Sequence, residues 1–241
     1  MAGLKCNGSL KKAAKYYLAS PKCMYMAMNE TPMLKRRQTI LRILIHQFVI
    51  SNCYYVIKVT VFQDCEYEFV ALDFETATSE RSSACALGVV FADSMGREVG
   101  SDYWLIRPPG NYYLDINIAI HGIYPDQTQE SPNFGDLWSE ISDLFVGKTL
   151  IAHNAPFDRG VLNSTLMHYG QEPVDNTFIC SLALARRYLR DLSRYKLSFI
   201  ANYFDYDFIH HNALEDARAC LFVANKSVEF SPFDSIHSAW K

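Results

Sequence analysis

The sequence has few features of a secreted or membrane protein. Its seven cysteines are odd in number, widely spaced and without a CxxC pair, which argues against a disulfide framework and a zinc site. The charged start is not followed by the apolar core and cleavage site of a signal peptide. The apolar stretch 40–62 carries Arg42, His46 and Lys58, so it is a poor membrane span. We therefore expect free or buried thiols in a soluble, cytoplasmic protein without a membrane partner.

Acidic residues are almost absent from the first quarter of the chain. Residues 1–63 contain ten lysines or arginines and one acid, Glu30, whereas residues 64–241 contain 13 basic and 25 acidic residues. The formal net charge of −3 hides this division. We expect a basic N-terminal extension over 1–63, a main domain over 64–230 and a tail over 231–241. The extension could be a nucleic-acid-binding arm, a transit peptide or a segment that the fold does not need.

The sequence also lacks internal repeats and low-complexity segments, and its 49% hydrophobic content is enough for a sizeable core. Three consecutive strands and then alternating helices and strands predict an α/β domain with a mixed central sheet flanked by helices. Apolar runs and turn residues predict strands over 68–74, 84–92, 101–107, 149–153 and 177–180, and helices over 133–146, 156–170, 181–190, 197–203 and 212–227.

Two carboxylates stand at the end of the first of these strands, in Asp73-Phe74-Glu75. Residues two apart in a strand project from the same face, so both carboxylates should lie side by side at the edge of the sheet. Like charges that close repel each other, and a divalent cation removes the repulsion. The pair alone is weak support for a metal site, because many solvated strand ends carry one.

Two further acids are expected at the beginnings of helices. Asp158 follows the 149–153 strand and falls in the first helical turn, where the helix dipole alone could account for it. Asn212 and Glu215 have the spacing of a capping box, which puts Asp216 just inside the last helix and His211 in the loop before it. A loop histidine beside carboxylates can act as a base near neutral pH, although most such histidines are only solvated.

Taken together, three segments resemble the exonuclease motifs of the DEDD superfamily: DFET at 73–76, HNAPFD at 153–158 and HNALED at 211–216. A histidine five residues before the last aspartate resembles the DEDDh branch, which includes the epsilon subunit of bacterial DNA polymerase III, RNase T and oligoribonuclease. His-Gly-Ile at 121–123 and SLALAR at 181–186 are similar to further elements of the epsilon-like members. The resemblance covers roughly residues 66–228.

The resemblance implies an RNase H-like fold and a site for two divalent cations, Mg²⁺ or Mn²⁺. His211 would be the general base, and His210 is the weaker candidate because it stands six residues before the last aspartate. The implied metal ligands are Asp73, Glu75, Asp158 and Asp216. The residues expected to meet the 3′-terminal nucleotide are Phe74, Thr76 and His121, and Asn154 and Phe157 are further expected substrate-binding residues.

The expected function is that of a metal-dependent 3′→5′ exonuclease that releases nucleoside 5′-monophosphates from the 3′ end of a single strand. DNA is favoured over RNA. The alternatives are an RNA-directed exonuclease similar to RNase T or oligoribonuclease, and a non-catalytic nucleic-acid-binding module. A DNA polymerase is a further possible partner, although no clamp-binding peptide is evident. A basic cluster could follow the phosphate backbone or form a solvated helix face: Arg186, Arg187, Arg190, Arg194 and Lys196.

Overall fold

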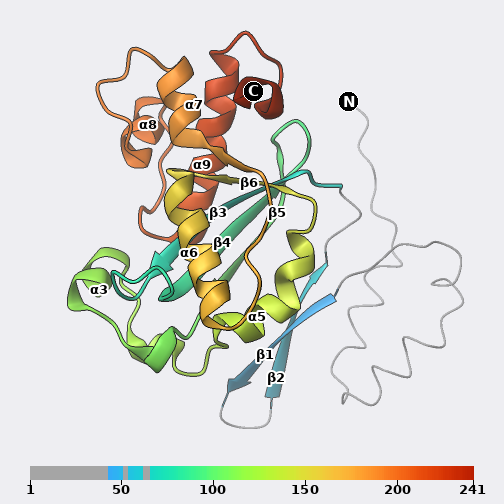
Figure 1. The fold of residues 1–241 in the computed structure, drawn as a ribbon, viewed down its shortest axis with the longest axis vertical. Coiled ribbons are helices and arrows are strands. Elements are labelled where there is room, and N and C mark those ends of the chain that lie inside the picture. Colours follow the sequence, from blue (N-terminus) through green and yellow to red (C-terminus); the bar gives the residue numbers. More distant parts are fainter. Residues whose placement is uncertain (1–42, 51–53, 62–65) are drawn as a thin grey trace, which may run out of the picture. The chain divides into compact units, whose positions relative to one another are not determined.

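A computed structural model describes residues 66–241 and the backbone course of 43–50 and 54–61 (Figure 1). The two earlier segments are strands, β1 (Ile43–Ile50) and β2 (Tyr54–Val61), which pair antiparallel with Ile43 opposite Val61. These strands were not predicted from the sequence, and the expectations for the rest of 1–63 concern residues outside the described ones. Within the described chain, no helix combines the length and apolar character that a bilayer crossing requires.

The five-stranded sheet of the main domain has the order β5-β4-β3-β6-β7. β3 pairs antiparallel with β4, and β4 pairs antiparallel with β5, whereas β3, β6 and β7 run parallel. This arrangement confirms the predicted mixed sheet. The strands are β3 (Phe69–Thr76), β4 (Ala84–Ala92), β5 (Glu98–Leu105), β6 (Thr149–Ala152) and β7 (Phe178–Cys180).

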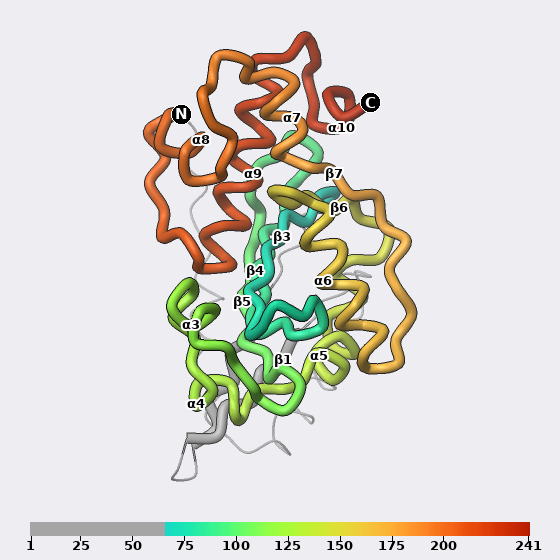
Figure 2. The backbone as a smooth tube through the Cα atoms, turned by 60° about the vertical axis from the view of Figure 1, so that its left-hand side comes forward, coloured from blue at the N-terminus to red at the C-terminus, as the bar shows by residue number. Residues whose placement is uncertain are grey.

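Helices cover both faces of this sheet, as Figure 2 shows. One face carries α5 (Phe134–Ile141) and α6 (Ala155–His168), and the other carries α9 (Ala213–Glu229) with α7 (Ser181–Tyr188) and α8 (Leu197–Tyr203) beside it. The pleat of β3 divides its side chains between the two layers. Val70, Leu72 and Phe74 pack with α5 and α6, whereas Phe69 and Ala71 pack with α9. Asp73 and Glu75 therefore continue the face that α9 covers.

Most predicted elements lie within about three residues of the observed ones, and the missed ones are short. The predicted 133–146 helix divides into α5 and a 3-10 turn at Ser142–Leu144. Two missed helices, α3 (Asp115–His121) and α4 (Pro125–Thr128), lie between β5 and α5, together with a 3-10 turn at Pro109–Asn111. The isoleucines of α3 stand at every second position, 116, 118 and 120, which is the spacing of a strand, and none of its residues is buried.

The segment 231–241 is part of the folded core. It contains the helix α10 (Ile236–Trp240), and Ile236 and Ala239 are buried beside Phe69 and α9. The Tyr188 hydroxyl donates a hydrogen bond of 2.9 Å to the Ala239 carbonyl, and His237 Nε2 lies 2.6 Å from Glu68 Oε1. The three cysteines of the described chain, Cys85, Cys180 and Cys220, are free thiols, and the other four lie outside it.

Candidate active site

The first feature of the site is a close approach of α9 to the sheet at Gly88. Gly88 lies opposite Asp73 in the β3–β4 register. A Cβ atom on Gly88 would lie 2.2 Å from the backbone carbon of Ala213, the first residue of α9. Only glycine leaves room for the helix there, because Cβ atoms do not approach backbone that closely. The absence of this one side chain brings the first turn of α9 onto the strand end that carries Asp73 and Glu75.

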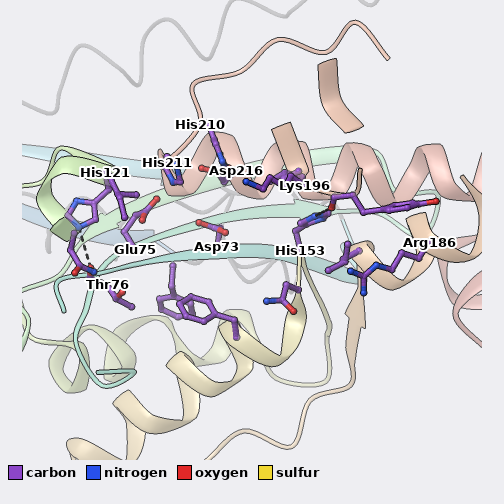
Figure 3. Close-up of a pocket in the computed structure, with 18 residues that line it drawn as sticks. Asp73, Glu75, Thr76, His121, His153, Arg186, Lys196, His210, His211 and Asp216 are labelled. Carbon is purple, nitrogen blue, oxygen red and sulfur yellow. Dashed lines mark hydrogen bonds and ion pairs between the residues drawn. The ribbon is translucent and has the colours of Figure 1, made fainter. Parts of the chain in front are cut away.

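The N-terminal turn of α9 directs Asp216 toward those two carboxylates. Asn212 caps the helix, and its side chain accepts a hydrogen bond of 3.2 Å from the Glu215 amide. The Glu215 carboxylate pairs with Arg218 at 2.7 Å, so only half of the predicted capping box forms. Asp216 begins the buried stripe that continues through Ala217 and Cys220. Carboxylate oxygens of Asp73, Glu75 and Asp216 all lie within 4.8 Å of one another (Figure 3).

The fourth acid, Asp158, reaches the strand end from the opposite layer. The chain turns from β6 into α6 through Asn154, whose φ of 68° is left-handed, a conformation that asparagine tolerates better than most residues. Asp158 is 2% exposed in the first turn of α6, and its Oδ1 accepts a hydrogen bond of 3.3 Å from the Phe74 amide. Phe74 stands between Asp73 and Glu75, so this bond fixes Asp158 beside the cluster.

The pKa values of these acids show how strongly their charges conflict. Burial and the nearby carboxylates raise the pKa of Asp73 well above its ordinary range. Burial, Asp216 and Asp158 raise the pKa of Glu75 to about 8. Burial also raises the pKa of Asp158 and of Asp216, the latter against the opposing effect of His210. Ionisation of all four acids is therefore unfavourable in the metal-free site, and a bound cation would relieve their repulsion.

The two adjacent histidines have different positions in this cluster. His210 Nδ1 lies 2.7 Å from Asp216 Oδ1, so His210 is the imidazole that pairs with a carboxylate. His211 has a left-handed φ of 65°, and its ring stacks on that of His210 at 3.9 Å. Burial and His210 lower the pKa of His211, and Asp216 opposes the shift. The resemblance implied His211 as the base, and in the structure both rings line the cavity beside the carboxylates (Figure 3).

His121, the last residue of α3, forms a hydrogen bond to the end of β3. Its Nδ1 accepts a hydrogen bond of 3.0 Å from the Ile123 amide, so Nε2 carries the proton and donates to the Thr76 carbonyl at 3.2 Å. Asn117 donates to the same carbonyl at 2.8 Å. Both ring nitrogens of His121 are therefore engaged in hydrogen bonds. Burial lowers the pKa of His121, in keeping with a neutral ring.

An open cavity of about 870 Å³ lies over these groups. Nine of the ten predicted site residues line it, and the tenth, Asp158, is buried. Phe157 is 39% exposed and contributes an aromatic ring, whereas Phe74 is 4% exposed. Six further lining residues were not predicted as site residues: Asn117, Ile120, His153, Leu182, Tyr195 and Leu197. Of these, His153 lies in the HNAPFD segment and Leu182 in the SLALAR segment.

The donor atoms at the centre of this cavity suit a divalent cation. Asp216 Oδ2 is buried and accepts no hydrogen bond within the described chain. A buried carboxylate oxygen without a partner is costly unless a cation or water satisfies it. The donor set consists of carboxylate oxygens, which hard cations such as Mg²⁺ and Mn²⁺ prefer. The residues present therefore fit a metal centre.

Solved structures define the class of the fold. Exonuclease I from E. coli, in a zinc-bound complex with single-stranded DNA, superposes with a TM-score of 0.61 at 18% identity, over 69% of this chain and 42% of that one. Exonuclease X, in complex with 5′-overhanging duplex DNA, gives a TM-score of 0.55 at 22% identity, over 72% of this chain and 99% of that one. The fold is therefore of the RNase H-like α/β class found in exonucleases, as predicted.

Sequence comparison gives the family. Residues 70–223 match the RNase_T family model, described as Exonuclease, and the chain belongs to this family. DNA polymerase III subunit epsilon of Treponema pallidum is 30% identical over 159 residues, or 64% of this chain and 73% of that protein. The PolC-type DNA polymerase III of Oceanobacillus iheyensis is 26% identical over 165 residues, 68% of this chain but 12% of that protein. The predicted enzyme class, a 3′→5′ exonuclease, is confirmed.

Proposed function

We propose that this exonuclease removes nucleotides from the 3′ end of single-stranded nucleic acid, DNA in preference to RNA, and releases nucleoside 5′-monophosphates. The observation that carries the proposal is the convergence of Asp73, Glu75 and Asp216 at the floor of an open cavity. Asp158 approaches from a third segment of the chain and would complete the set of ligands.

Two divalent cations, once bound, would activate water for attack on the phosphorus and stabilise charge on the attacking and leaving oxygens. The four carboxylates would hold this pair, which accounts for acids buried so close together. The peptide between Asp73 and Glu75 ties Asp158 to the pair through the Phe74 amide. The absence of a side chain at Gly88 leaves room for the first turn of α9, which carries Asp216. Mg²⁺ and Mn²⁺ both suit this oxygen-only set.

A histidine at the rim of the site would accept the proton of the attacking water. We assign this role to His211, because Asp216 already holds His210 through a 2.7 Å contact. The lowered pKa of His211 leaves its ring neutral and able to take a proton at neutral pH. In this arrangement His210 orients Asp216 and supports the stacked ring of His211.

The substrate assignment draws support from the relatives and from the cavity. The similar proteins are named as DNA polymerase III components, and the similar solved structures hold DNA. Thr76 and His121 lie on one side of the carboxylates, where a 3′-terminal nucleotide would be bounded by α3 (Figure 3). Phe74, Asn154 and Phe157 also line the cavity and would contact the substrate. Aromatic contacts of this kind tolerate any base.

Single-stranded DNA and RNA oligomers of matched sequence, labelled at the 5′ or the 3′ end, test the proposal. With Mg²⁺ or Mn²⁺, the 5′-labelled DNA should shorten stepwise, and the 3′-labelled DNA should release labelled mononucleotide at once. RNA should shorten more slowly, and a chelator should stop both reactions. Asp73→Ala and Asp216→Ala should be inactive with unchanged circular dichroism. Equal or faster cleavage of RNA would favour the RNA-directed alternative, and no nucleotide release by the wild type would favour a binding module.

A further inference from the structure

The cavity over the carboxylates is electrically asymmetric. Figure 3 shows Arg186 and Lys196 on one side of Asp73 and Asp216, and His121 with Thr76 on the other. The second side is lined by neutral groups, including Asn117 and Ile120 and the ring of His121. A strand that crosses the carboxylates would therefore meet cations at only one end of this cavity.

A second hollow extends the cavity at its cationic end. It measures about 480 Å³ and shares Asn154, Leu182 and Arg186 with the first. Cys180 and Arg187 are among the residues that it adds. Because the two hollows share three lining residues, they adjoin each other beside α7. We refer to the two adjoining hollows as the groove.

His153 forms a hydrogen bond to the loop that carries Lys196. The Nε2–H of His153 donates a hydrogen bond of 3.1 Å to the Tyr195 carbonyl, and its Nδ1 accepts one of 2.9 Å from the Ser181 hydroxyl. The Tyr195 hydroxyl in turn donates to the Leu189 carbonyl at 2.9 Å. Burial is the main reason that the pKa of His153 falls to about 4. The His153 ring therefore stays neutral, and keeps these hydrogen bonds, across the physiological pH range. Lys196 is thereby held at the edge of the cavity.

The five residues of the predicted basic cluster differ in whether they line a hollow. Arg186 and Lys196 line the cavity, and Arg187 lines only the second hollow. Arg190 and Arg194 are exposed on the same segment but line neither hollow of the described chain, and Arg190 donates to the Arg187 carbonyl at 3.1 Å. Arg190 and Arg194 therefore provide matched controls of equal charge.

We propose that Arg186 and Lys196 bind backbone phosphates on the 5′ side of the scissile bond. The terminal nucleotide then lies toward Thr76 and His121, and the strand leaves the site over α7. Each phosphodiester carries one negative charge, and the two cations offset its repulsion from the carboxylates. This assignment rests on the proposed exonuclease activity and adds the direction of the bound strand.

A pair of substrates isolates the groove from the reacting centre. The p-nitrophenyl ester of thymidine 5′-monophosphate has no phosphate on the 5′ side of the scissile bond, whereas a single strand of fifteen thymidines has many. In the double variant R186Q/K196Q, the ratio of kcat/KM for the strand to kcat/KM for the ester should fall on the order of tenfold. The slope of log kcat/KM for the strand against log salt should become shallower by roughly 1.4, from two lost single-strand contacts. The control R190Q/R194Q should keep the wild-type ratio and slope.

An unchanged ratio in R186Q/K196Q, or an equal fall in the control, would overturn the proposal. Fluorescence anisotropy with labelled strand in Ca²⁺ measures the groove without hydrolysis. Weaker binding by R186Q/K196Q alone would support the strand path even if the wild type cleaved neither substrate, a result that would count against the proposed function instead. Equal binding by both variants and the wild type would reject the path.

Discussion

At the scale of single residues, the site combines acids that destabilise one another. Glu75 is 8% exposed, and burial together with Asp216 and Asp158 raises its pKa to about 8. Burial and the other three carboxylates of the cluster likewise raise the pKa of Asp73. Groups with such perturbed pKa values cluster at functional sites, because function requires them despite their cost to stability.

Replacing one acid by its amide should therefore separate stability from activity. Glu75→Gln removes a charge but keeps the shape, so the metal-free protein should gain roughly 1–3 kcal/mol of unfolding free energy. Urea denaturation in EDTA measures this change, and hydrolysis should be lost in the same variant. A matched substitution at exposed Glu172, Glu172→Gln, should change neither quantity. A less stable Glu75→Gln protein would show that the carboxylates are not in conflict.

The two neighbouring histidines give a second prediction at this scale. His211→Gln should lower kcat by about 10²–10⁴-fold and abolish the acidic limb of its pH profile, as expected for loss of a general base. His210→Gln should have the smaller effect on kcat and should weaken Mn²⁺ binding, because His210 contacts Asp216. Measurement of kcat from pH 5 to 9 in both variants tests this assignment. A larger loss of kcat and of the acidic limb in His210→Gln would transfer the role to His210.

At the scale of secondary structure, the contact between α9 and β4 sets the position of Asp216. A methyl group at Gly88 would overlap the backbone of Ala213 and force the helix away from the sheet. Gly88→Ala should cost about 1–3 kcal/mol of stability through overpacking. Displacement of Asp216 by an ångström should lower kcat on the order of 100-fold.

Gly147 provides the matched control for this substitution. It has a φ of 69°, and no atom of the described chain lies within 4 Å of a Cβ built there. Gly147→Ala should cost about 1–2 kcal/mol from backbone strain and leave kcat unchanged. Thermal unfolding and kcat of both variants check the comparison. Full activity in Gly88→Ala would mean that Asp216 does not need this close approach.

The elements that the sequence predicted are those with strong local signals. The 84–92 strand is a continuous buried run, and both ends of the predicted strand match β4. Helix α9 begins at Ala213, as the Asn212 cap indicated. Helix α3 was missed because none of its residues is buried and because Asn117 and His121 hold it by hydrogen bonds to the end of β3. Such contacts depend on tertiary structure that no local pattern contains.

The site was predictable in composition more than in geometry. Strand alternation and helix starts gave the positions of the four acids, and the resemblance to the DEDD motifs implied that they form one metal site. The Phe74–Asp158 hydrogen bond joins residues far apart in sequence, so no local pattern predicts it. His211 was the favoured histidine, but it is His210 that pairs with Asp216. The requirement for glycine at position 88 depends on which helix crosses that strand, so it could not be derived before the fold was known.

At the scale of the whole molecule, the raised pKa values predict an unusual pH dependence of stability without metal. A carboxyl group whose pKa is higher in the folded state stabilises the protein below the unfolded value, near pH 4, and loses this contribution as the pH rises through the folded value. For Glu75 the folded value is about 8, so Tm in EDTA should fall between pH 5 and pH 8.

Added Mn²⁺ should reverse this loss, because cations bind the ionised carboxylates and stabilise the folded chain. The increase in Tm on adding Mn²⁺ should therefore be larger at pH 8 than at pH 5.5. Scanning calorimetry with and without Mn²⁺ measures this difference, and Glu75→Gln should flatten the profile in EDTA. A metal-free Tm that rises from pH 5 to pH 8 would contradict the electrostatic account.

The most direct test is the number of Mn²⁺ ions that the intact chain binds in the presence of thymidine 5′-monophosphate. Titration calorimetry on the wild type should give two ions per chain, and the double variant Asp73→Asn/Asp216→Asn should bind none tightly and hydrolyse nothing. Two ions still bound by that variant, or strand hydrolysis that persists in it, would show that the cluster of Asp73, Glu75, Asp158 and Asp216 is not the catalytic metal centre.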